Sequence, residues 1–250
     1  MTVTAQGLID TTEMYLRTIF ELEEEGVVPL RARIAERVGQ SGPTVSQTVA
    51  RMERDGLLHV LGDRQLALSE VGRTLATRVM RKHRLAECLL VGVIKLPWEE
   101  VHIEACRWEH VISENVERRL VELLGYPVRC PHGNLIPGLA ELGLPDAAAE
   151  QARAAMSEAG EAMTKVASGD TARVVIRRIG EHIQSDRVLM LKLRCAGIQP
   201  GREVIVMAGD DGVRVRPDEE ADAGWTELDG PLAAHIFVSL SGRYQPAAGA

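Results

Sequence analysis

The sequence lacks the features that mark membrane-spanning and secreted proteins. No apolar run in its 250 residues approaches the roughly 18 residues that a membrane helix needs, residues 89–94 being the nearest. Residues 1–7 carry no basic start followed by an apolar stretch, which a secretory signal requires. Only four cysteines occur, and no two of them form a Cys-x-x-Cys pair, as is usual in a reducing cytosol. We therefore expect a cytoplasmic protein.

Aromatic residues and net positive charge are also scarce. The chain has three Trp, three Tyr and two Phe, and none of them lies between residues 31 and 75, so this segment offers no platform for stacking single-stranded bases. Taken alone, the net charge of −7 argues against a nucleic-acid partner. However, eight acids and two arginines in residues 210–229 contribute −6, whereas residues 31–64 contribute +2. A local basic surface is therefore compatible with the acidic total.

What the sequence does contain begins with three helical patterns and a hairpin. Residues 8–25 form the first predicted helix, with Asp10 or Thr11 as its cap. Residues 30–38 and 43–55 form two short helices around a Ser-Gly-Pro turn, and Val45, Val49 and Met52 recur at the spacing of a buried stripe. Residues 57–60 and 65–68 have the pattern of short strands around a turn at 62–64. This order predicts a winged helix-turn-helix.

The outward face of the second short helix carries the residues that would read DNA. Gln47 can pair with adenine in the major groove, and Pro43 can touch a thymine methyl group. Arginines of this small unit can hold phosphates. The alternative is a winged helix that binds another protein, with a polar face that is merely solvated. We favour DNA, and the residues expected to contact it are Arg31, Arg33, Arg37, Ser41, Pro43, Thr44, Ser46, Gln47, Arg51, Arg54 and Arg64.

The remainder of the chain divides into helical, linking and β-rich segments. We predict helices over residues 79–90 and 101–124, a loop rich in Pro and Gly over 125–145, and a helical connector within 147–166. Strands are predicted at 173–178, 203–207, 212–216 and 235–240, the pattern of a small β-barrel. The fold class is therefore mainly α with small β elements. The predicted domains are a winged helix (1–77), a helical domain (78–145), a linker (146–170), a β-domain (171–242) and a tail (243–250).

Metal-ligating side chains are concentrated near the middle of the chain. Four of them lie close together in sequence: His102, Cys106, Glu109 and His110. Steps of four, three and one residues keep such side chains on or near one face of a helix. His83 and Glu87 form a further pair on the preceding predicted helix. One such pair alone is more often a surface ion pair, but thiol, imidazole and carboxylate groups on two helices suit a divalent transition metal.

Three stretches carry a family resemblance: residues 10–19 (DTTEMYLRTI), 41–47 (SGPTVSQ) and 104–110 (EACRWEH). They resemble the iron-dependent regulators of the diphtheria-toxin repressor family, and the likeness runs over about residues 8–145 and more weakly over the last third. The resemblance implies a homodimeric repressor of iron-uptake genes. It also implies a winged-helix domain, a helical domain for dimerisation and metal binding, and a C-terminal SH3-like domain.

The resemblance further implies two metal sites in each subunit. The primary, regulatory site would use Met14, Cys106, Glu109 and His110, and the ancillary site would use His83, Glu87, His102, Glu181 and Gln184. A Met in a helix is usually core filler, so Met14 rests on the resemblance alone. Family members selective for manganese tend to have oxygen ligands where this chain has Met14 and Cys106. The implied cofactor is therefore iron(II), with Co²⁺, Ni²⁺, Zn²⁺ or Mn²⁺ as substitutes.

Relatives with two sites also hold an anion beside the ancillary site, and Arg84 and Asn134 would bind it here. Cys130 stands at a position where the resemblance leads us to expect a hydroxyl group. Cys130 and His132 form a Cys-Pro-His sequence in a loop. No second pair accompanies them to complete a tetrahedron, so we reject a zinc site there.

The expected partners are double-stranded DNA and a second copy of the chain, with no membrane and no small-molecule substrate. A dimer implies a roughly palindromic operator, and Trp108, on another side of the ligand-bearing helix, is expected at the dimer contact. Three alternatives stay open: a manganese-responsive regulator of the same fold, a metalloenzyme built on the His/Cys/Glu cluster, and a metal-independent regulator. No His-Glu-x-x-His motif and no Gly-rich phosphate loop supports an enzyme, so we predict none.

Overall fold

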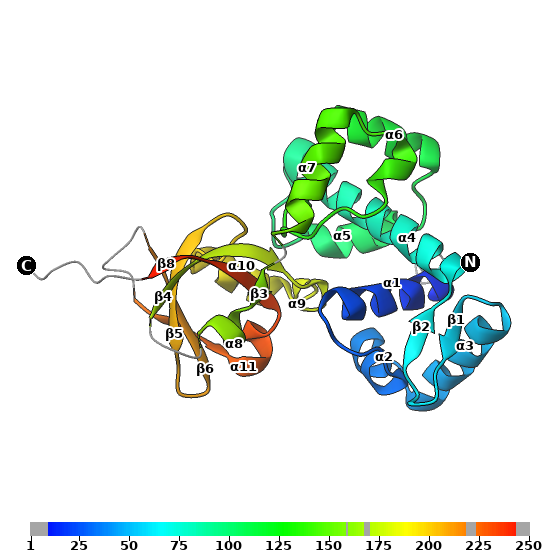
Figure 1. The fold of residues 1–250 in the computed structure, drawn as a ribbon, viewed down its shortest axis with the longest axis horizontal. Helices are drawn as coiled ribbons and strands as arrows, with labels where there is room; N and C mark the ends of the chain where they lie inside the picture. The colour runs from blue at the N-terminus through cyan, green and yellow to red at the C-terminus, as the bar shows by residue number, and fades with distance from the viewer. Residues whose placement is uncertain (1–9, 159, 168–170, 219–223, 244–250) are drawn as a thin grey trace, which may run out of the picture. The chain divides into compact units, whose positions relative to one another are not determined.

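The structure is a computed structural model that describes residues 10–158, 160–167, 171–218 and 224–243. These residues belong to two units, which are described separately (Figure 1). The first unit contains the chain up to residue 92 together with 103–127 and 136–144. The second contains 93–102, 128–135 and the chain from 145 onward. No helix in the described ranges is both long enough and apolar enough to cross a lipid bilayer.

The N-terminal part of the first unit is a group of three helices followed by a two-stranded wing. The elements are α1 (Thr11–Glu24), α2 (Arg31–Val38), α3 (Gly42–Arg54), β1 (Leu58–Val60) and the antiparallel β2 (Leu66–Leu68). Asp10 starts α1 by accepting hydrogen bonds from the N–H groups of Thr12 and Glu13. Ser41 caps α3 by accepting from the N–H of Thr44. The predicted winged helix-turn-helix is confirmed.

One hydrophobic core holds these elements together. α1 contributes Tyr15 and Ile19, and the wing contributes Leu58 and Leu66, all fully buried. The predicted stripe of α3 enters the same core with three residues: Val45, Val49 and Met52. Because this stripe faces inward, the opposite face of α3 is left exposed to solvent.

The helix predicted over residues 79–90 begins earlier than expected. α4 (Glu70–Leu89) starts at a cap formed by Ser69, which accepts from the N–H of Gly72, and it continues into a π-helical turn, η2 (Leu90–Ile94). A Cβ at Gly72 would lie 1.9 Å from the carbonyl oxygen of Leu57. Glycine therefore allows the first turn of α4 to pack directly on the backbone of Leu57, just before β1.

The prediction of one long helix over residues 101–124 is wrong. The chain forms two shorter helices there, α5 (Val101–Trp108) and α6 (Glu114–Leu123). The N–H groups of Val111 and Ile112 both donate to the carbonyl of Trp108, which closes a turn. Ser113 then caps α6 by accepting from Val116 N. Residues 109 and 110 therefore lie in the turn after α5, and only the first of them keeps a helical hydrogen bond.

A buried ion pair fixes α4 against α6. Arg81 Nε lies 2.8 Å from Glu117 Oε1, and both side chains are only 1% exposed. Arg81 Nη1 also donates to the carbonyl of Gly138 at 2.7 Å, just before the short helix η3 (Leu139–Leu142). The same segments also share one apolar cluster, formed by Leu85, Val121, Ile136, Leu139 and Leu142. These contacts hold α4, which carries two of the predicted ligands.

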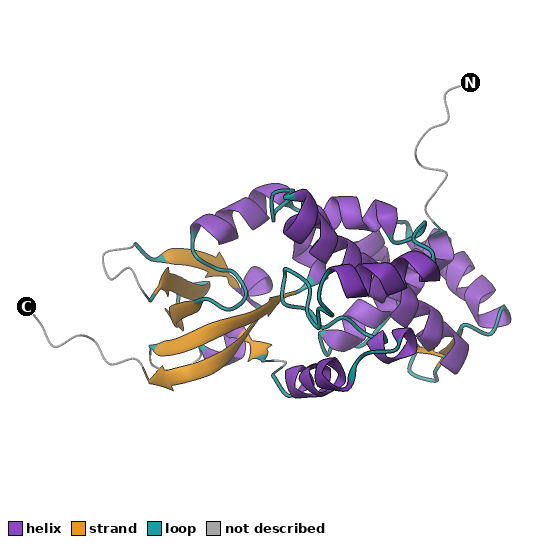
Figure 2. Ribbon diagram, turned by 90° about the horizontal axis from the view of Figure 1, so that it is seen from above, coloured by secondary structure: helices purple, strands orange, loops and turns teal. Residues whose placement is uncertain are grey.

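The second unit is built on a six-stranded antiparallel sheet with the order β3-β8-β4-β5-β6-β7 (Figure 2). Its strands are β3 (Glu161–Ala162), β4 (Ala172–Ile179), β5 (Glu203–Ala208), β6 (Gly212–Pro217), β7 (Thr226–Asp229) and β8 (Ile236–Arg243). Its helices are α7 (Asp146–Met156), α8 (Met163–Val166), α9 (Glu181–Gln184), α10 (Arg187–Cys195) and α11 (Gly230–Ala233). The four predicted strands correspond to β4, β5, β6 and β8, whereas β3, β7 and α10 were not predicted.

Segments far from the sheet in sequence complete its core. Met163, in the predicted linker at 146–170, is fully buried against the sheet, and Trp98 enters the same core. The indole N–H of Trp98 donates to the carbonyl of Pro131 at 3.0 Å. The N–H of Ile179 donates to the carbonyl of His132 at 2.9 Å, which joins residues 128–135 to the end of β4. Residue 159, residues 168–170 and the predicted tail from 244 onward lie outside the described residues.

Candidate metal centre and nucleic-acid interface

Glu109 is the centre of the predicted primary site. Its N–H still donates to the carbonyl of Ala105 at 3.0 Å, so the chain keeps a helical path for one residue past α5. The carboxylate is 1% exposed and accepts from His83 Nδ1 at 2.6 Å. His110 Nε2 lies 3.3 Å from its other oxygen. Two predicted ligands, His83 on α4 and His110 in the turn after α5, thus contact the same carboxylate.

α1 supplies further groups to this cluster, and sequence reasoning missed two of them. Arg17 Nη1 lies 3.1 Å from Cys106 Sγ and 2.9 Å from Glu109 Oε2. Glu13 Oε2 lies 2.6 Å from His110 Nδ1. These two residues are one helical turn apart on α1. Their positions in sequence, one residue before and three residues after Met14, are the only signal that could have identified them.

Met14 lies on α1 between these two contact residues. Its side chain is half-buried and packs against the core of the N-terminal helices. It therefore fills space, as methionines in helices usually do. Glu13 and Arg17, which precede and follow it on α1, both contact the cluster.

The charges of the cluster compensate one another. Burial raises the pKa of Glu109, but Arg17, His83 and His110 outweigh this effect and lower the pKa to about 2. Burial lowers the pKa of His83, but Glu87, Cys106 and Glu109 raise it well above its usual range. These directions describe an anionic carboxylate that faces cationic partners. A metal ion bound here would take over the charge that protons and a guanidinium now supply.

The predicted ancillary ligands are buried on three elements. His83 and Glu87 on α4 are fully buried and face each other, with Nε2 and Oε1 3.1 Å apart. His102 at the start of α5 is 4% exposed, and Glu181 on α9 is 3% exposed. Gln184, also on α9, donates from Nε2 to the carbonyl of Ile179 at 2.8 Å. Its Oε1 is buried and has no hydrogen-bond partner among the described residues.

The residues predicted to hold an anion have protein partners. Arg84 is fully buried, and its Nη1 lies 3.1 Å from Glu24 Oε1, so a carboxylate of α1 occupies its guanidinium. Asn134 donates from Nδ2 to the carbonyl of Ile179 at 2.8 Å, and its Oδ1 lies 3.4 Å from Arg178 Nη1. An anion at either side chain would have to exchange with these groups.

Cys130 and His132, for which we rejected a zinc site, lie in the second unit. Both are buried. The His132 ring lies 4.8 Å from the Trp98 ring, centroid to centroid, with its Nε2 3.3 Å from the Trp98 carbonyl oxygen. The N–H of Cys130 donates to the carbonyl of Asn134 at 2.9 Å.

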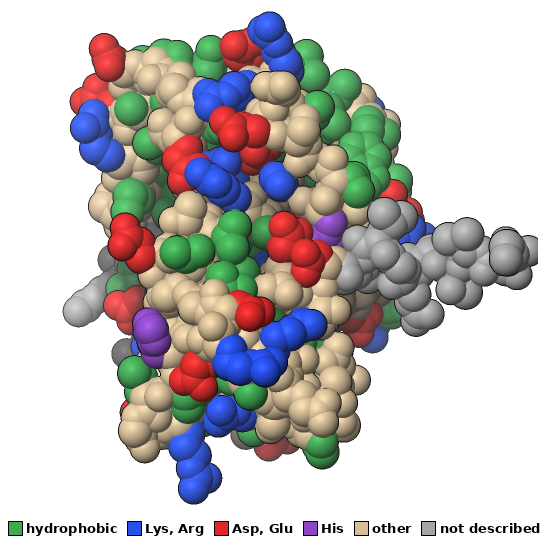
Figure 3. Space-filling model, turned by 90° about the vertical axis from the view of Figure 1, so that its right-hand side faces the viewer, with side chains coloured by type: hydrophobic (Ala, Val, Ile, Leu, Met, Phe, Trp, Pro, Cys, Tyr) green, Lys and Arg blue, Asp and Glu red, His purple; other side chains and the backbone are tan. Residues whose placement is uncertain are grey.

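The exposed face of α3 is the candidate nucleic-acid interface. Seven of the predicted contact residues on and before this helix are exposed: Ser41, Pro43, Thr44, Ser46, Gln47, Arg51 and Arg54. In the lower part of Figure 3, Lys and Arg side chains lie at the surface beside acidic ones. Tyr15 donates its hydroxyl to Gln40 Oε1 at 2.6 Å, which ties the turn before α3 to the core.

The predicted arginines of α2 and the wing differ in their freedom to contact DNA. Arg37 pairs with Glu25, Nη2 to Oε2 at 2.5 Å, and its side chain is 9% exposed. Arg33 donates to the carbonyl of Val28. Arg31 is half-buried, whereas Arg64 is exposed at the tip of the wing, with a left-handed φ of 68°. Arg64 is therefore better placed for a phosphate than Arg37.

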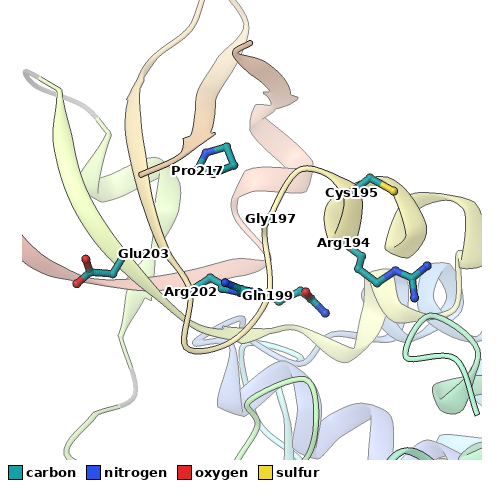
Figure 4. Close-up of a pocket in the computed structure, with 7 residues that line it drawn as sticks. All are labelled: Arg194, Cys195, Gly197, Gln199, Arg202, Glu203 and Pro217. Carbon is teal, nitrogen blue, oxygen red and sulfur yellow. The ribbon is translucent and has the colours of Figure 1, made fainter. Parts of the chain in front are cut away.

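A small cavity of about 220 Å³ lies in the second unit, between α10 and strands β5 and β6 (Figure 4). Its lining residues are Arg194, Cys195, Gly197, Gln199, Arg202, Glu203 and Pro217. None of the predicted metal or DNA residues is among them. The side chain of Glu203 points away from Arg194 and Gln199.

A winged helix with an open polar face, joined to helices that gather a thiol, imidazoles and carboxylates, defines a class of protein: the metal-responsive DNA-binding regulators. Two family descriptions match the chain in this order. The iron dependent repressor N-terminal DNA binding domain matches residues 7–66, and the iron dependent repressor metal binding and dimerisation domain matches residues 69–138. The chain belongs to the iron-dependent repressor family.

The relatives agree with this assignment. The chain is 62% identical over 200 residues to the iron-dependent repressor IdeR of Mycobacterium tuberculosis, covering 80% of this chain and 84% of that protein. It is 54% identical over 222 residues to the diphtheria toxin repressor of Corynebacterium jeikeium, covering 86% and 92%. The solved structure of a manganese-dependent transcriptional repressor in complex with manganese has a TM-score of 0.74 at 28% identity, covering 92% and 100%.

Two of the open alternatives are thereby answered. The chain is a metal-activated DNA-binding repressor that forms a homodimer, and the family is not one of enzymes. The relative named for iron is 62% identical to this chain, against 28% for the structure named for manganese, so a manganese regulator is not the better assignment.

Proposed function

We propose that this repressor is activated by iron(II) and controls genes for iron uptake and iron homeostasis. The names of the relatives support iron, and so does the donor chemistry, because Cys106 and Met14 offer soft sulfur ligands. The observation that carries the proposal is the position of Arg17. Its guanidinium already places a positive charge 3.1 Å from Cys106 Sγ and 2.9 Å from Glu109 Oε2. The donor set therefore accommodates a cation.

The primary site would be formed by Met14, Cys106, Glu109 and His110. A metal ion bound there supplies charge and directional bonds that join α1 to the turn after α5. In this chain, Glu13 holds His110 by its Nδ1, which leaves Nε2 facing the Glu109 carboxylate. α1 packs in the same core as α3, so a change at its ligand-bearing face can reach the DNA-reading helix.

A second, ancillary site would use His83, Glu87, His102, Glu181 and Gln184. The buried Oε1 of Gln184 supports it, because an amide oxygen without a partner is costly inside a protein and suits a cation. Two sites in each subunit follow from this proposal, with Co²⁺, Ni²⁺, Zn²⁺ or Mn²⁺ as substitutes. Arg84 and Asn134 would hold an anion only by exchanging their present partners.

The DNA target is proposed to be a roughly palindromic, double-stranded operator in the cytoplasm. A two-fold dimer presents two copies of α3 to major-groove half-sites spaced by whole helical turns. Gln47 would read bases, whereas Arg51, Arg54 and Arg64 would hold phosphates. Trp108, half-buried and donating from Nε1 to Glu104 Oε1 at 3.0 Å, is proposed to lie at the dimer contact.

The test is an anaerobic titration of the purified chain with iron(II), with Co²⁺ as a redox-stable stand-in, while binding to a palindromic operator is followed. Operator affinity should rise with metal, and iron(II) should act at lower concentration than Mn²⁺. Equal operator binding with and without metal would refute the proposal. Activation by Mn²⁺ and not by iron(II) would show that manganese, rather than iron, is the activating metal.

A further inference from the structure

Arg17 occupies a position that the function described so far does not explain. It is an arginine on α1 whose side chain is 14% exposed. One guanidinium nitrogen, Nη1, contacts Cys106 Sγ at 3.1 Å and both oxygens of Glu109 at 2.9 and 3.0 Å. Its Nε lies 3.0 Å from Glu21 Oε1, four residues along α1. The same nitrogen therefore touches two proposed ligands of the primary site.

In this arrangement the guanidinium already occupies the two ligands that a metal ion would use. Metal–sulfur and metal–oxygen bonds to a divalent transition ion are about 2.0–2.3 Å long. An ion within that distance of both Cys106 Sγ and a Glu109 oxygen would share both ligands with Nη1, which lies 3.1 Å from the sulfur and 2.9 Å from the carboxylate oxygen. Two positive charges that share the same ligands in a buried site repel each other. The ion therefore competes with the guanidinium for both ligands.

We propose that Arg17 is an internal counter-cation that holds the primary ligands together in the metal-free protein and is displaced by the activating ion. This inference rests on the proposed primary site. In the metal-free state, Arg17 neutralises a buried carboxylate that would otherwise be costly, since an unpaired buried charge destabilises a protein. In the metal-bound state, α1 contacts the cluster through Met14, one turn earlier on the same helix.

The consequence is a threshold for activation. The ion must compete with the guanidinium that is already in place. The favourable free energy of metal binding is therefore reduced by the free energy needed to displace Arg17. The exchange also ties metal binding to α1, because the residue that leaves and the residue that binds are three positions apart on that helix.

The experiment compares Co²⁺ binding to the parent chain, Arg17→Gln and Arg73→Gln, without DNA. Binding is read from thiolate-to-cobalt absorbance and from calorimetry, and metal-free stability is read from thermal unfolding. Arg73 is the matched control, because it pairs with Glu23 of the same helix away from the cluster. Arg17→Gln should bind Co²⁺ about five- to 150-fold more tightly than the parent while unfolding at a lower temperature without metal. Arg73→Gln should keep the parent affinity.

Arg17→Lys keeps the proposal testable if the glutamine variant does not fold. Lysine retains a charge but has no planar fork to bridge sulfur and carboxylate, so its Co²⁺ affinity should lie between those of the parent and Arg17→Gln. Unchanged or weaker affinity in the folded variants would overturn the inference. If the Cys106→Ser variant keeps the thiolate-to-cobalt absorbance band, the primary site itself is refuted. Failure of the primary site is thus distinguishable from failure of the inference about Arg17.

Discussion

Met14 has two roles in this protein, one in core packing and one as a proposed metal ligand. Its side chain packs against the N-terminal core, yet it is the one proposed ligand on α1. Truncation would therefore confuse lost packing with a lost ligand. A variant that keeps the volume and removes only the sulfur separates the two duties.

Met14→Leu should keep the fold, the dimer and the affinity for non-specific DNA, but should lose most of the metal-stimulated operator binding. The loss should be about five- to 150-fold, the usual range for coupling between two sites. Operator titrations with and without Co²⁺ measure it, and Met14→Ala should behave alike with some loss of stability. A Met14→Leu protein as metal-responsive as the parent would place the switch elsewhere.

The lowered pKa of Glu109 predicts a loss of stability in acid. Its folded pKa of about 2 lies below the ordinary value of 4.5, so the ionised carboxylate stabilises the metal-free fold above about pH 4.5. That contribution, on the order of 3 kcal/mol, should disappear as the pH falls from 4.5 towards 2.

Thermal unfolding of parent and Glu109→Gln between pH 2 and pH 6 checks this. The variant should be less stable at pH 6, because Arg17 and His83 lose their shared partner, and its stability should fall less with acid. Some slope should remain, since Arg78 and Arg81 also hold the pKa of Glu141 below its usual value against the effect of burial. Parallel pH profiles for the two proteins would show that Glu109 is not the titrating group.

At the scale of an element, α3 separates a packing face from a reading face. Three apolar residues anchor it, and Ser41 fixes its first turn, so the exposed residues are presented on a rigid support. Such a support suits direct readout of base edges, which requires side chains in fixed positions.

Gln47→Ala should cost about 1–3 kcal/mol on the preferred operator and little on random DNA, because it removes a base contact. Arg51→Ala should weaken binding to both and reduce the salt dependence by about one unit of slope, because it removes a phosphate contact. Salt titrations of both variants on both DNAs measure the split. A uniform effect of Gln47→Ala on all sequences would reverse the assigned roles.

At the scale of the whole molecule, the sheet unit depends on chain segments that precede it. Trp98 lies in the core of this unit although it comes well before β4 in sequence, and it is 9% exposed. Residues 128–135 are bonded to the end of β4 as well. Removing the chain after residue 144 should therefore change the environment of residues that remain, such as Trp98.

A chain ending at residue 144 should show red-shifted fluorescence from Trp98, because the truncation removes the apolar residues that bury it. The contribution of Trp98 to the fluorescence is found by comparing the truncated chain with its Trp98→Phe variant, in which Trp108 is the remaining tryptophan. The N-terminal core and the Cys106–Glu109 cluster belong to the first unit and should stay folded, as circular dichroism can show. An unshifted Trp98 signal would contradict its burial against the sheet.

Local patterns in the sequence determined the winged helix, four strands of the sheet and the identity of most candidate ligands. They could do so because these features are local in the sequence: the stripe of α3, the cap at Asp10, the Ser-Gly-Pro turn before α3, and the spacing of ligands near Cys106. The break between α5 and α6 escaped the same reasoning, since the apolar periodicity continues through it while Trp108 and Ser113 end and restart the helix.

Only the tertiary structure decided which groups face one another. Arg17 and Glu109 are 92 residues apart in sequence, and no local pattern distinguishes a buried arginine from a solvated one on an amphipathic helix. Their contact arises because α1 and the turn after α5 pack in one unit, where low polarity makes every charge need a partner. The sequence determined the donors, and the packing of distant segments determined that a cation already lies among them.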